Sequence, residues 1–250
     1  MKVIAIYNLK GGVGKTAAAV NLAYWSATSG YRSLLWDLDA QGAASCYLRV
    51  KTRIKGGAAS LIERRKNLAR ACRNTEYNNL DLVPADFSYR NFDLELNDHK
   101  KADQRLKKLL SVIKPEYDLA WLDCAPNLSV VSENVFNMAD YVLMPLIPTH
   151  LSVRAYDQVQ KFCNKNGFKV RLLPYFSMVD RRKRLHREII VEFAGKHPDV
   201  LTSYIPYASQ IEQMGTHRAP VNAYADNSVG GRAFSALWNA LQQRLKLKAP

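Results

Sequence analysis

Short runs of apolar residues alternate along this chain with longer segments in which apolar residues recur every three or four positions. The apolar runs occupy residues 2–7, 32–39, 80–86, 117–126, 141–148, 168–180 and 201–207. The segments with helical spacing occupy residues 15–30, 129–138, 152–164 and 184–194. Continuous apolar runs are typical of buried strands, whereas the longer periodic segments are typical of helices. The pattern therefore predicts strands that alternate with helices.

This alternation predicts the fold class. Strands that are apolar on both faces and are separated by helices form a mostly parallel central sheet flanked by helices on both faces, which is an α/β architecture. Ligands of such sheets bind at the carboxyl ends of the strands. We therefore expect the functional residues of this chain in the loops that directly follow its strands.

The loop after the first strand is rich in glycine and contains the segment LKGGVGKT at residues 9–16. Glycines let backbone N–H groups surround phosphate oxygens, because they adopt positive φ angles and permit close approach. We expect Lys15 to reach the β- and γ-phosphates and the Thr16 hydroxyl to bind Mg²⁺, at the positive end of the following helix. The predicted nucleotide-binding residues of this loop are Gly11, Gly12, Val13, Gly14, Lys15, Thr16 and Ala17.

Acidic residues end two further strands. Asp37 and Asp39 lie two residues apart at the end of the second strand, so their side chains point in the same direction. Asp123 ends the apolar part of residues 117–126, which is the usual form of a Walker B element that holds Mg²⁺ through water. Together with Thr16, Asp123 forms the predicted magnesium site, to which the family resemblance described below adds Asp37.

Composition limits the kind of protein to which this site belongs. The chain has 250 residues, 48% of them hydrophobic, and residues 1–250 are expected to form one domain. The formal net charge of +14 indicates a polyanionic partner, either nucleic acid or an anionic membrane. Every apolar run is too short for a signal peptide or a membrane span, so we expect a cytoplasmic protein. The first strand begins at residue 2, so we expect no N-terminal DNA-reading extension.

The segment KGGVGKT resembles the deviant Walker A loop of the ParA/MinD superfamily of P-loop ATPases, whose first position need not be glycine. The resemblance covers essentially the whole chain. It implies a catalytic role for Lys10, because the extra lysine of this family crosses a dimer interface to the phosphates bound by the other subunit. Two ATP molecules would then lie between two chains, so that ATP holds a homodimer together.

Other segments extend the resemblance to the catalytic carboxylates. DLDAQG, at residues 37–42, is similar to the family's D-x-D-P-Q-x element. The match implies that Asp39 orients or activates the attacking water, and that Asp37 helps to arrange the magnesium and the loop. Ala40 stands where the family commonly has proline.

The resemblance also concerns the base and the α-phosphate. The segment SMVDRR is similar to the family segment that follows the next strand, and SYIPYASQIEQM is similar to the family's I-P loop, which lies against the adenine. The match implies that Met178 and Pro206 contact the base, and ordinary packing explains both residues equally well. Ala17 replaces a threonine that is common after the loop lysine, so a hydroxyl group to the α-phosphate is missing.

The densest basic run is RRKRLHRE, at residues 181–188, where ParA proteins carry basic residues that touch DNA phosphates. A solvated helix face is the ordinary alternative for such a run. Several phosphate contacts on each subunit, doubled in a dimer, would bind double-stranded DNA without reading its bases. The predicted DNA-binding residues are Arg181, Arg182, Lys183, Arg184, Arg187 and Arg232.

The resemblance implies an ATPase that dimerises on ATP, associates nonspecifically with the nucleoid and positions a plasmid, chromosome or other cargo. A ParB-like adaptor would stimulate its slow hydrolysis. A reductase or metal chaperone of the same superfamily would share a cysteine pair between subunits, but Cys46, Cys72, Cys124 and Cys163 are widely scattered. A DNA-compacting protein with a vestigial nucleotide site is a further alternative, and the intact loop argues against it.

A MinD-like membrane anchor is the other alternative for the positive charge. The C-terminal stretch places Phe234, Leu237, Trp238, Leu241 and Leu245 on one face of a helix with basic residues opposite, as an interfacial anchor would. The same stripe would also pack on the sheet. We favour packing, and expect no membrane partner, because the stripe continues the folded domain without a linker.

Overall fold

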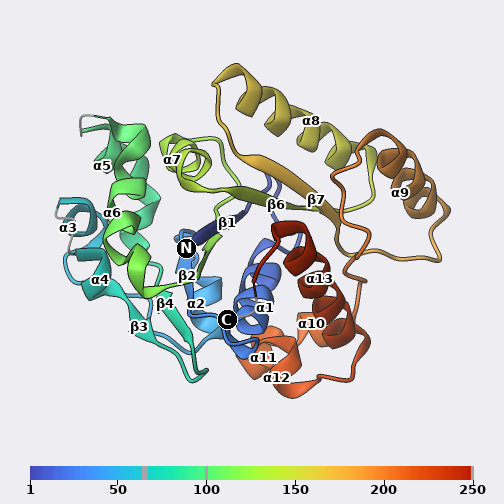
Figure 1. Cartoon of the computed structure of the whole chain (residues 1–250), viewed down its shortest axis with the longest axis horizontal. Coiled ribbons are helices and arrows are strands. Elements are labelled where there is room, and N and C mark those ends of the chain that lie inside the picture. Colours follow the sequence, from blue (N-terminus) through green and yellow to red (C-terminus); the bar gives the residue numbers. More distant parts are fainter. Residues whose placement is uncertain (64–66, 99–100, 249–250) are drawn as a thin grey trace.

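A central β-sheet crosses the molecule, with helices on both of its faces (Figure 1). The computed structural model describes residues 1–63, 67–98 and 101–248. Within these residues the sheet has seven strands in the order β3-β4-β2-β5-β1-β6-β7. The strands are β1 (Lys2–Ile6), β2 (Ser33–Asp37), β3 (Arg73–Asn74), β4 (Leu80–Val83), β5 (Leu119–Asp123), β6 (Tyr141–Leu146) and β7 (Arg171–Phe176).

The strand register brings three strand ends to one point. All neighbouring strands are parallel except β3, which pairs antiparallel with β4 at the edge of the sheet. Asp123 of β5 lies opposite Ile6 of β1 and opposite Asp37 of β2. The loops that follow β1, β2 and β5 therefore leave the sheet side by side, which confirms the predicted α/β fold and its expected ligand edge.

Helices connect the strands and cover the sheet. The four predicted helices are present as α1, α7, α8 and α9, with ends shifted by at most two residues. The α-helices are α1 (Lys15–Thr28), α2 (Ala43–Tyr47), α3 (Gly57–Glu63), α4 (Asn67–Ala71), α5 (Phe92–Asn97), α6 (Arg105–Ile113), α7 (Val130–Met138), α8 (His150–Lys165), α9 (Arg184–Lys196), α10 (Ser209–Glu212), α11 (Met214–His217), α12 (Val221–Tyr224) and α13 (Val229–Leu245). Short 3₁₀ helices are η1 (Phe87–Asn91), η2 (Ala102–Gln104) and η3 (Lys114–Glu116).

The prediction of a strand at residues 201–207 is wrong. This segment follows the edge of β7, and the Ile205 N–H donates to the Phe176 carbonyl at 2.9 Å. Only an isolated bridge between Val179 and Pro206 is formed, however. Leu201 and Ile205, four residues apart, donate to the carbonyls of Pro174 and Phe176, which are only two residues apart. The segment therefore bulges between residues 201 and 205, and this bulge interrupts the regular pairing of a strand.

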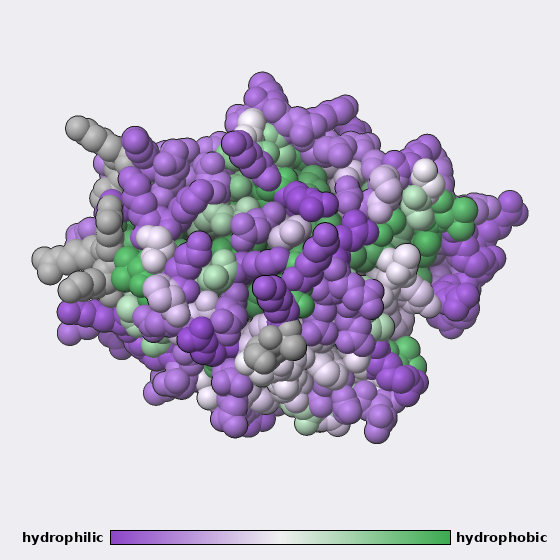
Figure 2. Space-filling model, in the orientation of Figure 1, coloured by the Kyte–Doolittle hydropathy of each residue, from purple (hydrophilic) through white to green (hydrophobic). Residues whose placement is uncertain are grey.

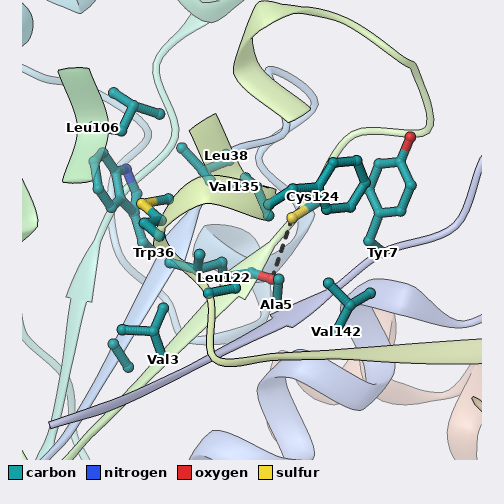
Figure 3. Packing of buried hydrophobic residues seen from close by; sticks show 14 of the residues in the cluster. Val3, Ala5, Tyr7, Trp36, Leu38, Leu106, Leu122, Cys124, Val135 and Val142 are labelled. Carbon is teal, nitrogen blue, oxygen red and sulfur yellow. Dashed lines mark hydrogen bonds between the residues drawn. The ribbon is translucent and has the colours of Figure 1, made fainter. Parts of the chain in front are cut away.

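Two hydrophobic clusters lie on the two faces of the sheet. Successive side chains of a strand point to opposite faces, so Val3 and Ala5 of β1 enter one cluster, whereas Ile4 and Ile6 enter the other. Figure 3 shows the first cluster, in which Trp36 of β2 packs with residues of β1, β5, α6 and α7. In Figure 1, α7 and α8 lie on one side of the sheet and α1 and α13 on the other.

The C-terminal helix packs on the sheet, as favoured from the sequence. Its apolar stripe is buried, and Trp238 is 1% exposed. The Trp238 indole N–H donates to Ser29 Oγ at 2.9 Å, and its ring lies 6.2 Å from that of Trp121. The face seen in Figure 2 is mainly hydrophilic, with apolar atoms in separate small areas. Among the described residues, none of the helices has the length and apolar character required to cross a bilayer.

Candidate nucleotide-binding site

A pocket of about 330 Å³ opens at the carboxyl edge of the sheet, between the glycine-rich loop and the segment around Pro206. It is also lined by Ala43 and Tyr47 of α2 and by Phe234 of α13. Many residues predicted from the sequence meet here, although they are separated by up to 195 positions in the chain. The predicted residues that line the pocket are Gly11, Gly12, Gly14, Lys15, Thr16, Ala17, Asp39, Met178 and Pro206.

The glycine-rich loop has the backbone that its composition predicts. Gly12 and Gly14 adopt φ angles of +69° and +90°, which L side chains rarely adopt. A β-carbon at Gly14 would also lie only 2.9 Å from Ser177 Oγ. The helix α1 begins at the next residue, so its free N–H groups and positive end face the pocket. Val13 does not line the pocket and is buried beneath the loop.

A buried asparagine fixes the start of this loop. The Asn8 amide donates to the Pro145 carbonyl of β6 at 2.7 Å, and its oxygen accepts the Lys10 N–H at 2.9 Å. The loop is thereby joined to the neighbouring strand. Sequence reasoning missed this residue, because nothing in the pattern indicates which strand lies beside β1.

Lys15 is held beneath the loop. Its side chain is 7% exposed, and its ammonium group donates to the Lys10 carbonyl at 2.9 Å. Burial lowers the pKa of Lys15, and the carboxylate of Asp123 acts in the opposite direction. The ammonium group is therefore already desolvated and directed by the loop, which suits a cation that must contact phosphate oxygens.

Asp123 is a buried carboxyl group whose oxygens lack hydrogen-bond partners within the described chain. Burial raises its pKa well above the ordinary value, and the neighbouring Asp37 raises it further. The Thr16 hydroxyl and the Lys15 ammonium act in the opposite direction. An unpartnered buried carboxyl group beside a hydroxyl fits Mg²⁺, which takes one or two protein ligands and completes its shell with water and phosphate oxygens.

The described residues contain no cluster of three or more His, Cys, Asp or Glu side chains that could hold a metal. A metal held by protein side chains alone is thus not indicated in this part of the chain. The donors at the pocket are suited to a metal that arrives with phosphate groups.

Asp37 and Asp39 occupy different positions and have different contacts. Asp39 lines the pocket and accepts the Gln41 N–H at 3.0 Å. Asp37 lies beneath it, fully buried, and accepts the N–H and the hydroxyl of Ser45 at 2.8 and 2.7 Å. Burial raises the pKa of Asp37 to about 6, although the hydrogen bonds from Ser45 act in the opposite direction. Asp37 therefore anchors α2 to the end of β2, a contact that the sequence did not reveal.

The far end of the pocket is apolar and aromatic. Met178 has a φ angle of +55°, and lies near Pro206 through the bridge at Val179. The Tyr207 hydroxyl donates to Glu212 at 2.6 Å on the pocket wall. Tyr175 also lines the pocket, and its buried hydroxyl has no hydrogen-bond partner among the described residues. Sequence reasoning missed these tyrosines, because a tyrosine in an apolar strand or loop carries no motif.

Lys10 differs from Lys15. Its side chain is half-buried, and in the described part of the chain its ammonium group has no hydrogen-bond or ion-pair partner. Lys10 does not line the pocket of this single chain. It therefore stands beside the site as a cation without a counter-charge.

The predicted DNA-binding residues between β7 and α9 are exposed, and we call them the Arg181 segment: Arg181, Arg182, Lys183, Arg184 and Arg187. Arg182 pairs with Asp180 at 3.0 Å, and Arg184 pairs with Glu188 at 2.6 Å. Arg187 donates to the Arg181 carbonyl at 2.6 Å.

Three cations of this segment, Arg181, Lys183 and Arg187, form no ion pair within the described residues. Within the described residues, the side chains of Arg181 and Lys183 form neither ion pairs nor hydrogen bonds. Arg232 lies on a separate helix, α13, where it donates to the Asn227 carbonyl. No hydrogen bond or ion pair among the described residues joins it to the segment.

Comparison with known proteins assigns the chain to a family. The family model described as an AAA domain (AAA_31) matches residues 1–170, more than half of the chain. The chain belongs to this family. The chromosome-partitioning ATPase Soj of Treponema pallidum (strain Nichols) is 27% identical over 242 residues, which cover 94% of this chain and 95% of Soj. The predicted membership of the ParA/MinD-type ATPases is thereby confirmed.

Solved structures show the same fold. A plasmid partition protein from Borrelia burgdorferi B31 bound to AMPPNP is 22% identical, covers 97% of this chain and 99% of its own, and superposes with a TM-score of 0.80. The cobyrinic acid a,c-diamide synthase of Mycobacterium smegmatis, with a bound ATP analogue and magnesium, is 23% identical, with coverage of 100% and 98% and a TM-score of 0.82. The predicted ATPase activity and the predicted cofactors, ATP and Mg²⁺, are confirmed as those of this partition ATPase family.

Proposed function

We propose that this ATPase forms a homodimer on binding ATP, binds double-stranded DNA without sequence preference, and partitions or positions a plasmid, a chromosome or another cargo. The observation that carries the proposal is Lys10, a cation that lies beside the nucleotide pocket without a counter-charge and does not line the pocket of its own chain. Soj, the relative at 27% identity, is named as a chromosome-partitioning ATPase.

Lys10 links the nucleotide to dimerisation. A cation that does not line the pocket of its own chain can complete the pocket of a second chain. Its contact with a triphosphate would then form only when the dimer closes, so ATP binding and self-association stabilise each other. Charge that develops on the phosphates during hydrolysis would be stabilised by the same group.

Each of the remaining groups of the site has its own role in binding or hydrolysing ATP. Lys15, already desolvated, contacts the phosphate oxygens, and the N–H groups of the loop and of α1 surround them. Thr16 and Asp123 would hold Mg²⁺, which supplies charge neutralisation when it is bound. Asp39, on the pocket wall, orients the attacking water, while Asp37 holds the start of α2 and thereby the loop that carries Asp39.

The Arg181 segment provides the DNA contacts. Arg181 and Lys183 form no ion pair within the described residues, and all five cations are exposed. Contacts of this kind bind the phosphate backbone and weaken steeply with salt. A dimer presents two such segments, so dimerisation raises DNA affinity through avidity. ATP would control DNA binding in this way, and the protein would associate with the nucleoid in the cytoplasm.

A ParB-like adaptor at the cargo would stimulate hydrolysis, return the protein to monomers and release it locally from DNA. This step rests on the family resemblance. The MinD-like alternative requires the apolar stripe of α13 at the membrane, but that stripe is buried against α1 and the sheet. Flotation of the ATP-bound protein with anionic liposomes tests the alternative directly, and we expect the protein to stay with the DNA fraction.

Two substitutions test the dimer. Asp39→Ala should bind ATP and Mg²⁺ but hydrolyse ATP slowly, and should therefore accumulate as a dimer on DNA. Adding Lys10→Ala to this variant should return it to monomers at saturating ATP, as measured by solution scattering. Lys161→Ala, an exposed lysine on α8, is the matched control and should leave the dimer intact. A scattering mass of one chain for Asp39→Ala at saturating Mg·ATP would contradict the proposal.

A further inference from the structure

More than half of the net charge of this protein lies in a part of the chain that the DNA-binding prediction does not include. Residues 49–74 contain nine Lys or Arg residues and one Glu, whereas the whole chain carries a formal charge of +14. This charge is spread over 26 residues, and outside residues 64–66 small, polar and apolar residues separate the cations. The segment follows α2, continues through α3 and α4, and ends in the edge strand β3.

Six of these cations, all in the part of the chain that the structure describes, line two adjoining hollows. Two hollows of about 810 and 490 Å³ share Ile54, Lys55, Gly56 and Arg73 as a common wall. We call the combined surface the Arg49–Arg73 groove. The basic residues that line it are Arg49, Lys51, Arg53, Lys55, Arg70 and Arg73.

Few carboxylates neutralise these cations. Arg49 pairs with Glu76 at 3.3 Å, and Arg73 donates only to the backbone carbonyls of Arg70 and Cys72. Within the described part of the chain, the side chains of the other four, Lys51, Arg53, Lys55 and Arg70, form no hydrogen bond or ion pair. Two carboxylates, Glu63 and Asp86, also line the hollows. Six cations against these two carboxylates leave an excess of positive charge, which favours an anionic ligand.

The wall formed by residues 49–55 is anchored in the fold. The Val50 N–H donates to the Ser45 carbonyl at 3.0 Å, and the Ile54 N–H donates to the Asp86 carboxylate at 2.8 Å. The side chain of Ile54 is buried, whereas the cations on either side of it are exposed. The backbone thus holds the cations on one side while apolar residues between them pack inward.

We propose that the Arg49–Arg73 groove binds the phosphate backbone of double-stranded DNA, as a second DNA surface separate from the Arg181 segment. The two surfaces lie at opposite edges of the sheet, one at β3 and the other after β7. With strands about 4.8 Å apart, six strand spacings separate these edges by about 29 Å. Figure 1 shows α3 and α9 at opposite ends of the molecule. One protomer can therefore contact two duplex segments.

Shape and composition favour DNA over a membrane at this groove. A membrane site would present apolar side chains for insertion next to its cations. The exposed large hydrophobic residues among the described ones all lie outside residues 49–74. A concave surface also receives the ridge of a phosphate backbone more readily than a flat bilayer. None of the groove cations lines the nucleotide pocket, so the groove binds DNA without ATP.

Because DNA binding by the groove needs no ATP, it can be tested separately from the proposed ATP-dependent dimer. Binding of nucleotide-free protein to a fluorescent 30-base-pair duplex is measured by anisotropy between about 50 and 200 mM salt. The groove variant carries Lys51→Gln, Arg53→Gln, Lys55→Gln and Arg70→Gln. Its matched control removes the same charge from exposed positions on and after α8, through Arg154→Gln, Lys161→Gln, Lys165→Gln and Lys169→Gln.

We expect the groove variant to lose affinity by about tenfold or more, and the slope of log K against log salt to fall by about 3 to 4, since each phosphate contact contributes about 0.9. The control should remain within about twofold of the parent protein. The double variant Lys51→Gln/Lys55→Gln changes only two exposed side chains, so its slope should fall by about half as much. This variant keeps the proposal testable if the fourfold variant does not fold.

Three results would overturn the proposal. The first is an absence of DNA binding by the nucleotide-free parent protein. The second is an equal loss in the groove variant and in the control, which would indicate only a long-range effect of net charge. The third is unchanged DNA binding by the groove variant together with loss of its binding to phosphatidylglycerol vesicles, which would assign the groove to a membrane.

Discussion

Asp37 makes the stability of the nucleotide-free protein depend on pH. Burial raises its pKa to about 6, from an ordinary value near 3.8. In the unfolded chain this carboxyl group loses its proton near pH 4, whereas in the folded chain it keeps the proton until near pH 6. Between these values the folded state binds more protons, so stability falls as pH rises. At about 1.4 kcal/mol for each pKa unit, the loss between pH 4 and pH 7 is about 3 kcal/mol.

The substitution Asp37→Asn removes this titration. The amide oxygen can still accept the hydrogen bonds from Ser45, while the negative charge that also raises the pKa of Asp123 is absent. Relative to the parent protein, the variant should gain up to about 3 kcal/mol in unfolding free energy between pH 4 and pH 7. For a chain of this size that gain corresponds to a rise of about 6 to 12 °C in Tm at pH 7.

Urea unfolding at several pH values, without nucleotide or magnesium, measures this difference. Asp157→Asn is the matched control, since Asp157 is a half-buried carboxyl group on α8 that has no hydrogen-bond or ion-pair partner among the described residues. The control should keep the pH dependence of the parent protein. If Asp37→Asn and the parent protein lose the same free energy between pH 4 and pH 7, the buried carboxyl group of Asp37 is not the origin of the effect and the reasoning is refuted.

Three further outcomes follow from the site, the basic segment and the core. Lys15→Ala should weaken ATP binding, measured by calorimetry, by about a hundredfold or more, since hydrogen bonds to charged groups contribute about 1.5 to 3 kcal/mol each. It should also abolish ATP-dependent DNA binding. Retained ATP affinity would contradict the role of the buried ammonium group. Arg181→Gln/Lys183→Gln removes four cations from the dimer and should lower the salt slope of ATP-dependent DNA binding by about 3 to 4 while leaving dimerisation unchanged. An unchanged slope would show that other residues make the DNA contact. Trp238→Ala should destabilise the protein by about 3 to 5 kcal/mol in denaturant unfolding, because it empties a fully buried site beside Trp121, and a loss below about 1 kcal/mol would show that α13 does not complete this core.

The features that could be predicted from sequence are those whose physical cause lies within a few consecutive residues. The glycines at positions 12 and 14 adopt the left-handed backbone that a phosphate loop needs, and α1 begins directly after them. The buried strands could be recognised because apolar residues follow one another there. The prediction of a strand at residues 201–207 was wrong because its apolar pattern resembles that of a strand, whereas the segment bulges between Leu201 and Ile205 and pairs only through an isolated bridge.

The partners of the site residues could not be predicted in the same way. Asn8 joins the loop to Pro145, and Ser45 donates two hydrogen bonds to one oxygen of the buried Asp37. Tyr175 reaches the pocket from β7. Each of these contacts depends on which strand or helix lies beside which, and the order of strands in the sheet differs from their order in the chain.

The amino-acid sequence by itself determined the α/β class, the phosphate loop and the excess of positive charge, because local backbone preference, apolar periodicity and composition act along the chain. Only the tertiary structure decided that Asp123 lies unpartnered near Lys15 and Thr16 and that the stripe of α13 is covered. It also decided that six described cations between Arg49 and Arg73 line two adjoining hollows. These features arise from distances between residues far apart in the chain, and such distances are set by the packing of the whole sheet and its helices.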